Sequence, residues 1–190
     1  ASGSDDLSIR IWDFASGEQI GSLNDHTDVI TDLAFSQDGQ TLVSSSRDGT
    51  VRLWDLSKAY TGGTLGQHER LDLDVETTGP AGNVEFTADG SQLITGHGDG
   101  KIRVWDFETR ELLREFGDHS GDVLALTFNA NETLLASGGV DRIIKVWDFA
   151  TGELVVEMQG HTEEIYTLTF NADSTEIYST AYDRYIRGWN

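Results

Sequence analysis

Residues 29–55 read VITDLAFSQDGQTLVSSSRDGTVRLWD, and three segments within them have the pattern of β-strands. VITDLAF, QTLVSSS and TVRLWD are short, rich in β-branched residues and alternate between the two faces of a strand. Asp38-Gly39 and Asp48-Gly49 separate them. An Asp-Gly pair between such segments predicts a hairpin turn, because glycine adopts the required backbone angles at little energetic cost. The stretch therefore predicts three antiparallel strands.

The same pattern returns along the whole chain, and tryptophan marks each repeat. Aspartate follows four of the five tryptophans, which are spaced by 42, 51, 42 and 42 residues: Trp12, Trp54, Trp105, Trp147 and Trp189. The segments EQIGSL, ELLREF and ELVVEM follow Trp-Asp pairs and predict a fourth strand. A period of about 40–45 residues with a Trp-Asp pair is typical of a propeller blade, which is a four-stranded antiparallel unit. We therefore predict an all-β propeller segment with repeats of approximately 14–55, 56–106, 107–148 and 149–190, preceded by a partial unit over 1–13.

Four residue types recur at fixed offsets in three of the repeats. Histidine precedes tryptophan by 28 residues each time, with serine and aspartate between them: His26, Ser44, Asp48, Trp54; His119, Ser137, Asp141, Trp147; and His161, Ser179, Asp183, Trp189. The pattern resembles the WD-repeat β-propeller family, and the resemblance covers essentially the whole chain. It implies that each set is a structural hydrogen-bonded tetrad, in which a buried indole, imidazole and carboxylate supply partners to one another.

Serine, histidine and aspartate are also the residue types of a hydrolase triad. Repetition favours the structural interpretation, because an enzyme needs one nucleophile whereas this set occurs three times. No phosphate-binding loop motif is present, and no spacing places three histidines on one element, His68 and His97 included. We therefore predict a chain that is not an enzyme and that has no catalytic residue, metal site or cofactor.

The repeat that ends at Trp105 departs from the pattern. It keeps Thr95 and Asp99, but alignment of its first strand places Thr77 where histidine is expected, which predicts an incomplete tetrad. It also holds nine extra residues within GQHERLDLDVETTG, residues 66–79. We interpret this stretch as an acidic loop, which is either a tolerated surface insertion or a contact specific to a partner.

The first and last repeats are incomplete. Ser2, Asp6 and Trp12 match tetrad positions of a unit that lacks an inner strand, and the last repeat has no outer strand. We expect three four-stranded blades that begin near Val29, Asn83 and Val123, with an incomplete unit on each side. A fragment of a longer propeller, an oligomerising arc and a four-bladed ring with a displaced first strand all agree with this count. An open arc exposes a sheet face, so further blades of a parent chain or of a second copy are expected partners.

The charge of the chain is strongly negative. There are 33 acidic and 13 basic residues, for a formal net charge of −20. We predict no nucleic-acid or membrane partner, because neither phosphates nor anionic lipids would find a basic patch. A basic protein or peptide is the better match; a solubilising surface or a high-salt environment are alternative explanations of the acidity. The absence of cysteine and of a signal peptide predicts a cytoplasmic location.

The resemblance also implies where a partner binds. In the family, exposed positions of one face fall three and five residues after the tetrad histidine and one before the tetrad aspartate. These are Val29, Thr31, Arg47, Asp122, Leu124, Val140, Glu164, Tyr166 and Tyr182, with Asp5 in the partial unit and Pro80, Gly82 and Gly98 in the repeat without the histidine. Tyrosine and arginine beside carboxylates predict a pocket for a peptide with a basic anchor; packing between blades is the alternative. We expect an interaction scaffold, or else a regulatory domain of a larger signalling protein or a self-assembling structural fragment.

Overall fold

The computed structural model describes residues 1–57, 70–72 and 79–190, and all regular structure in these residues is β-strand. The first sheet has three antiparallel strands: β1 (Ser2–Gly3), β2 (Ile9–Trp12) and β3 (Gln19–Leu23). The second sheet has four: β4 (Ile30–Phe35), β5 (Thr41–Ser46), β6 (Val51–Asp55) and β7 (Arg70–Asp72). No helix in the described part of the chain is long and apolar enough to cross a membrane.

The remaining strands form three further sheets. The third sheet comprises β8 (Ala81–Phe86), β9 (Gln92–His97), β10 (Ile102–Asp106) and β11 (Leu112–Phe116). The fourth comprises β12 (Val123–Phe128), β13 (Leu134–Gly139), β14 (Ile143–Asp148) and β15 (Leu154–Gln159). The fifth is three-stranded, with β16 (Ile165–Phe170), β17 (Ile177–Ala181) and β18 (Ile186–Trp189). The predicted three four-stranded blades between two incomplete units are thus confirmed.

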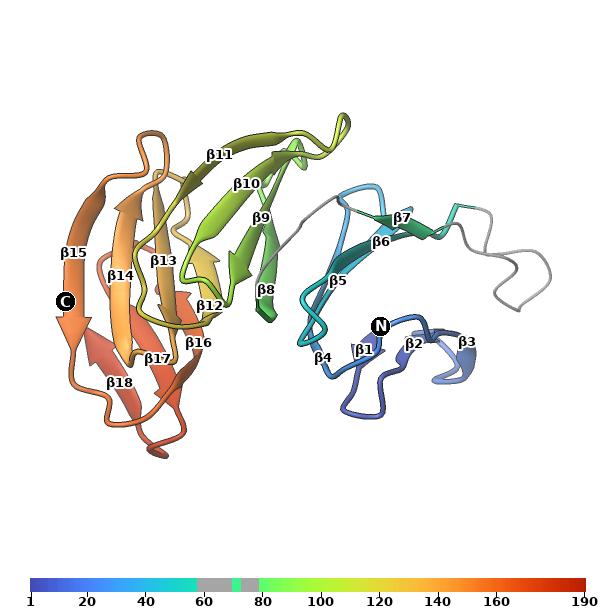
Figure 1. Cartoon of the computed structure of the whole chain (residues 1–190), viewed down its shortest axis with the longest axis horizontal. Helices are drawn as coiled ribbons and strands as arrows, with labels where there is room; N and C mark the ends of the chain where they lie inside the picture. Colours follow the sequence, from blue (N-terminus) through green and yellow to red (C-terminus); the bar gives the residue numbers. More distant parts are fainter. Residues whose placement is uncertain (58–69, 73–78) are drawn as a thin grey trace.

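The sheets follow one another around an open arc. The inner strands β4, β8, β12 and β16 contact one another in that order, and the first and fifth sheets lie at opposite ends of the arc (Figure 1). Strand β3 pairs with β2 in its own sheet. The structure therefore does not form the four-bladed ring in which this strand would pair with the last blade.

The hydrophobic core lies between neighbouring sheets. Four separate clusters of buried side chains fill the four interfaces. The first three contain the tryptophan of the later sheet, and the partly buried Trp189 packs against the fourth. Small residues let the inner strands approach closely: a Cβ added to Gly82 would lie 1.9 Å from the carbonyl oxygen of Val123. Close approach at this point brings the loops of successive sheets to a common centre.

The Asp-Gly pairs form the predicted turns. Gly39 and Gly49 have positive φ angles of 68° and 83°, and their N–H groups donate to the carbonyl oxygens of Ser36 and Ser46. In the fourth sheet the glycine of this pair is replaced by Arg142, which adopts a φ of 67°. An L-residue is strained in this region because its Cβ approaches the carbonyl oxygen.

The structure corrects one expectation and refines another. The stretch 66–79 is not entirely a loop, because residues 70–72 form β7, which pairs with the edge of β6 from Arg52 to Trp54. This short strand satisfies backbone groups that the edge of β6 would otherwise leave unpaired. The third sheet begins at Ala81, two residues before the expected start near Asn83. His68 and Thr77 lie outside the described residues.

Candidate functional site

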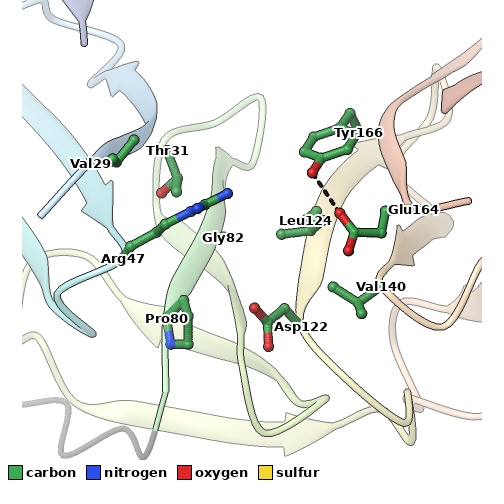
Figure 2. A pocket seen from close by; sticks show the side chains of 10 residues that line it. All are labelled: Val29, Thr31, Arg47, Pro80, Gly82, Asp122, Leu124, Val140, Glu164 and Tyr166. Carbon is green, nitrogen blue, oxygen red and sulfur yellow. Dashed lines mark hydrogen bonds between the residues drawn. The ribbon is translucent and has the colours of Figure 1, made fainter. Parts of the chain in front are cut away.

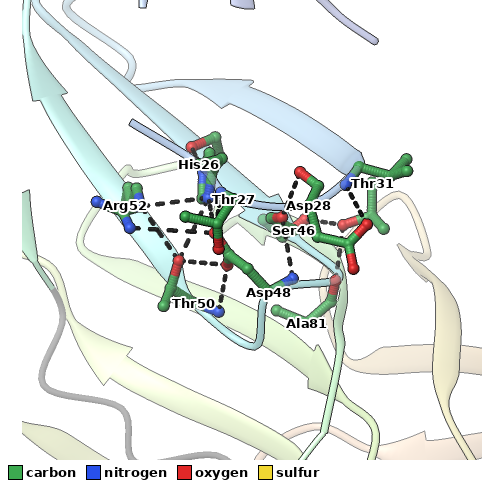
Figure 3. A network of polar contacts seen from close by, with 12 residues as sticks. His26, Thr27, Asp28, Thr31, Ser46, Asp48, Thr50, Arg52 and Ala81 are labelled. Carbon is green, nitrogen blue, oxygen red and sulfur yellow. Dashed lines mark hydrogen bonds and ion pairs between the residues drawn. The ribbon is translucent and has the colours of Figure 1, made fainter. Parts of the chain in front are cut away.

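The first tetrad connects the inner loop of the second sheet to its buried strands. Nδ1 of His26 lies 2.8 Å from Asp48 Oδ2, and its Nε2 lies 2.7 Å from Ser44 Oγ. The indole N–H of Trp54 donates to the same Ser44 oxygen at 2.9 Å. Figure 3 shows this network around His26 and Asp48, together with Thr27 and Thr50. The tetrad therefore holds the loop before β4 against the turn between β5 and β6.

The same hydrogen bonds recur in the fourth and fifth sheets. The histidine lies 2.9 Å and 2.7 Å from the aspartate, and 2.7 Å from the serine in both, for His119 with Asp141 and Ser137 and for His161 with Asp183 and Ser179. The serines of all three tetrads are at most 1% exposed. A hydroxyl buried in this way cannot reach a substrate, so these sets do not have the access that a hydrolase nucleophile needs.

Hydrogen bonding keeps the tetrad aspartates ionised. Burial raises the pKa of Asp48, but hydrogen bonds from the Thr50 hydroxyl, the Thr27 N–H and His26 outweigh it and hold the pKa well below its usual range. The pKa of Asp141 is lowered by the same balance, with His119 as its first hydrogen-bond partner. An ionised carboxylate is the stronger acceptor for these donors.

The third sheet builds its tetrad differently. The indole N–H of Trp105 donates to Thr95 Oγ1 at 2.8 Å, and His97 Nε2 lies 2.7 Å from the same oxygen. His97 thus occupies the role of the tetrad histidine from a position on β9 itself, while Asp99 pairs with Arg103. A histidine two residues after the threonine faces the same side of a strand, which is the signal in the sequence that could have identified it.

His97 is buried as a neutral side chain. Burial is the main cause that lowers its pKa to about 3; Arg103 lowers it further and Asp99 raises it. Its Nδ1 has no hydrogen-bond partner among the described residues. Within the same residues, no group of three or more histidine, cysteine, aspartate or glutamate side chains could hold a metal ion. In the first sheet, Trp12 donates to Ser2 at 2.9 Å, and Asp6 pairs with Arg10.

A pocket of about 510 Å³ lies where the loops of four sheets meet. Figure 2 shows the ten side chains that line it: Val29, Thr31, Arg47, Pro80, Gly82, Asp122, Leu124, Val140, Glu164 and Tyr166. Eight of the nine predicted partner-binding residues are among them, together with Pro80 and Gly82 of the third sheet. Tyr182 does not line this pocket but packs edge-on against Tyr166, with ring centroids 4.7 Å apart. Asp5 and Gly98 do not line it either.

One repeated backbone hydrogen bond positions these residues. In four sheets, the residue before the tetrad aspartate donates its N–H to the residue that precedes the inner strand. The pairs are Arg47 to Val29 at 2.9 Å, Gly98 to Pro80 at 2.7 Å, Val140 to Asp122 at 3.0 Å and Tyr182 to Glu164 at 2.9 Å. The two loops that face the pocket are therefore tied together in every one of these blades.

The charges of the pocket are separated. The hydroxyl of Tyr166 donates to Glu164 Oε2 at 2.6 Å. Burial and this carboxylate raise the pKa of Tyr166 well above its usual value, so the phenol stays neutral. Burial raises the pKa of Asp122, an effect that Arg47 opposes and Glu164 reinforces. Arg47 and Asp122 make no side-chain hydrogen bond or ion pair with another described residue, so both charges remain available to a ligand.

Comparison with known proteins gives repeats that coincide with these sheets. The family described as "WD domain, G-beta repeat" matches residues 17–55, 77–106, 110–148 and 152–190. Three of the matches begin near the outer strand of one sheet, whereas the match over 77–106 begins shortly before β8. Each match ends on a Trp-Asp strand or on the final Trp-Asn. The four matches account for most of the chain.

Several known proteins are similar to parts of the chain. It is 50% identical over 46 residues to eukaryotic translation initiation factor 3 subunit I of Culex quinquefasciatus, and the aligned residues cover 24% of this chain and 14% of that protein. It is 30% identical over 106 residues to the U5 small nuclear ribonucleoprotein 40 kDa protein of Dictyostelium discoideum, covering 56% of this chain and 27% of that protein. It is 29% identical over 130 residues to pre-mRNA-processing factor 19 of Bos taurus, covering 67% of this chain and 24% of that protein.

The chain therefore spans between 14% and 27% of the length of these relatives. The sheets, the Trp-Asp period and the four repeat matches show that it belongs to the WD-repeat family.

Proposed function

We propose that this chain is a non-catalytic interaction platform whose central pocket binds a peptide segment of a protein partner. The observation that carries the proposal is the convergence of loops from four sheets on one pocket lined by Arg47, Leu124 and Tyr166. Its volume of about 510 Å³ lies within the range of about 300–1,000 Å³ found for ligand pockets. Tyrosine and arginine at its wall are residue types that dominate the energetics of interfaces.

The buried position of the tetrads supports a binding role over a catalytic one. Ser44, Ser137 and Ser179 have polar partners within the protein and are at most 1% exposed, which leaves little surface from which to attack a substrate. The described lining residues of the pocket include no serine, cysteine or histidine, and the hydroxyls of Thr31 and Tyr166 donate to the Ala81 carbonyl oxygen and to Glu164. These features fit recognition without covalent chemistry.

The relatives and the charge support a protein partner. Two of the relatives are named as a subunit of an initiation factor and as a ribonucleoprotein protein, which are names of parts of assemblies. A net charge of −20 repels nucleic acid and attracts basic protein surfaces. We therefore propose that the peptide carries a basic side chain.

A display experiment tests the proposal. Random dodecapeptides displayed on phage would be selected against the purified chain, and the enriched peptides measured against a Leu124→Trp variant that fills the pocket. Leu113→Trp is the matched control, because Leu113 is 49% exposed on the outer strand β11. We expect Leu124→Trp to abolish binding and Leu113→Trp to leave it unchanged. Peptides that bind both variants as well as the unmodified chain would show that the pocket is not the site.

A further inference from the structure

The two charged sides of the pocket lie apart and belong to different blades. Arg47 comes from the turn after β5 in the second sheet, whereas Asp122 and Glu164 precede the inner strands of the fourth and fifth sheets. Figure 2 shows the Arg47 side chain on one side of the pocket and the two carboxylates on the other. A ligand that fills the pocket therefore meets both signs of charge.

Arg47 is the only charged residue on its side of the pocket among the described lining residues. Its neighbours Val29, Pro80 and Gly82 are apolar, and the Thr31 hydroxyl donates to the Ala81 carbonyl oxygen at 2.6 Å. The hydrogen bond from the Arg47 N–H to the Val29 carbonyl oxygen fixes the backbone from which the side chain extends. A planar guanidinium with free donors matches a carboxylate, to which it can donate two parallel hydrogen bonds.

The opposite side is suited to a cation. Asp122 has no side-chain partner among the described residues, and Glu164 accepts one hydrogen bond from Tyr166, which leaves its remaining lone pairs available. The rings of Tyr166 and Tyr182 meet at an interplanar angle of 65° beside these carboxylates. Carboxylates stabilise a cation by charge, and an aromatic face adds a cation–π attraction.

The two sides of the pocket do not form an ion pair with each other among the described residues. No ion pair within 4.0 Å joins Arg47 to Asp122 or Glu164 among the described residues, although Arg47 and Glu164 both act on the pKa of Asp122. A ligand with only basic groups would place positive charge beside Arg47. A ligand with only acidic groups would place negative charge beside Asp122 and Glu164. Both mismatches cost binding free energy because like charges are brought together.

We infer that the pocket selects a dipolar peptide, in which a basic side chain lies against Asp122, Glu164 and Tyr166 while an acidic side chain pairs with Arg47. This inference rests on the proposed peptide-binding function and specifies its ligand. The basic group supplies the attraction to an acidic protein, and the acidic group supplies discrimination among the many basic sequences that the negative surface would otherwise attract.

Synthetic peptides derived from the display selection test the inference. The probe is the most enriched dodecapeptide, compared with versions in which its basic residue, its acidic residue or both are replaced by glutamine. We expect loss of either charge to weaken binding by at least about tenfold. Arg47→Glu should weaken binding of the parent peptide similarly and should favour a version in which the acidic residue is replaced by lysine.

A matched variant separates this effect from the change in net charge. Arg110→Glu alters the charge by the same amount, at an exposed residue of the β10–β11 turn outside the pocket. We expect it to bind like the unmodified chain. Because Arg47 is also exposed, Arg47→Glu should keep the same melting temperature.

The failures of the two proposals are distinguishable. If enriched peptides carry only basic residues and Arg47→Glu binds them as tightly or more tightly, the dipolar inference is wrong, while loss of binding in Leu124→Trp still supports the pocket. If Leu124→Trp binds the peptides unchanged, or if selection enriches no peptide, both proposals are overturned. Retained preference for the acidic residue in Arg47→Glu would also overturn the inference.

Discussion

Replacement of Ser44 by alanine measures how strongly a buried tetrad stabilises the fold. Ser44 Oγ lies 2.7 Å from His26 Nε2 and accepts the Trp54 indole N–H at 2.9 Å. Ser44 and Trp54 are both 0% exposed, so water does not replace the hydroxyl that the alanine substitution removes. Loss of a buried hydrogen bond of this kind costs about 1–3 kcal/mol, and for the two bonds of Ser44 we expect a loss of about 2–4 kcal/mol after local relaxation.

The first sheet provides a matched control for this substitution. Trp12 donates to Ser2 Oγ at the same distance of 2.9 Å and over the same separation of ten residues, but Trp12 is 43% exposed. Water can replace the serine there, so Ser2→Ala should change the free energy of unfolding by less than about 0.5 kcal/mol.

The assay is urea unfolding followed by tryptophan fluorescence, with amide hydrogen exchange of β5 and β6 to locate the loss. We expect faster exchange in these strands for Ser44→Ala and no change in them for Ser2→Ala. Equal losses for the two variants would refute the reasoning, because they would show that burial of the indole N–H does not set the energetic effect.

Four further predictions concern ionisation, backbone strain and a second tetrad. Burial lowers the pKa of His97 to about 3. The folded protein therefore holds a neutral His97, and this contribution to stability is fully present above pH 6.5 and is lost as the pH falls. Relative to His97→Gln, the free energy of unfolding of the unmodified chain should fall by about 2 kcal/mol between pH 6.5 and 5. Burial and the charges of Asp32 and Glu132 raise the pKa of Glu85 to about 7, so its contribution to stability is present below about pH 4.5 and is lost as the pH rises through 7. In urea unfolding, the unmodified chain should therefore lose stability relative to Glu85→Gln as the pH rises. Arg142 has a φ of 67°, and Arg142→Gly should raise the free energy of unfolding by about 0.5–1 kcal/mol; a decrease would argue against strain there. Asp141→Ala removes the acceptor of His119 and of the Ser120 N–H and should lower stability by about 1–3 kcal/mol, which unchanged thermal melting would contradict.

The blades could be predicted from the sequence because the strands and turns of each repeat depend mainly on local sequence patterns. Strand pattern, Asp-Gly turns and the Trp-Asp period agree with one another, and the observed sheets have the expected strand order. Strand β7 was missed although residues 70–75 read RLDLDV, in which charged and apolar residues alternate as they do in a strand. The many charges of this stretch favoured the interpretation as a loop, whereas residues 70–72 pair with the backbone of β6.

The candidate site was only partly accessible to sequence reasoning. The family resemblance, applied at fixed offsets from the tetrads, predicted eight of the residues that line the pocket. The role of His97 was missed, since it reaches Thr95 from its own strand and not from the loop where the other tetrad histidines lie. The separation of Arg47 from Asp122 and Glu164 also depends on how the blades are arranged around the arc, which no single repeat encodes.

The tetrads and the pocket are two consequences of the same loop geometry. In the second, fourth and fifth sheets the tetrad carboxylate holds the turn, and the residue before it donates its N–H to the residue that precedes the inner strand. In the third sheet the same backbone hydrogen bond joins Gly98 to Pro80, although the histidine that contacts Thr95 there is His97 of β9 and does not lie in the loop before the inner strand. Only the backbone of that residue is needed, so its side chain is free to be arginine, glycine, valine or tyrosine, at Arg47, Gly98, Val140 and Tyr182. A repeat that is nearly uniform in its buried residues can therefore carry a different side chain at this position in each of the four sheets, and two of these, Arg47 and Val140, line the pocket.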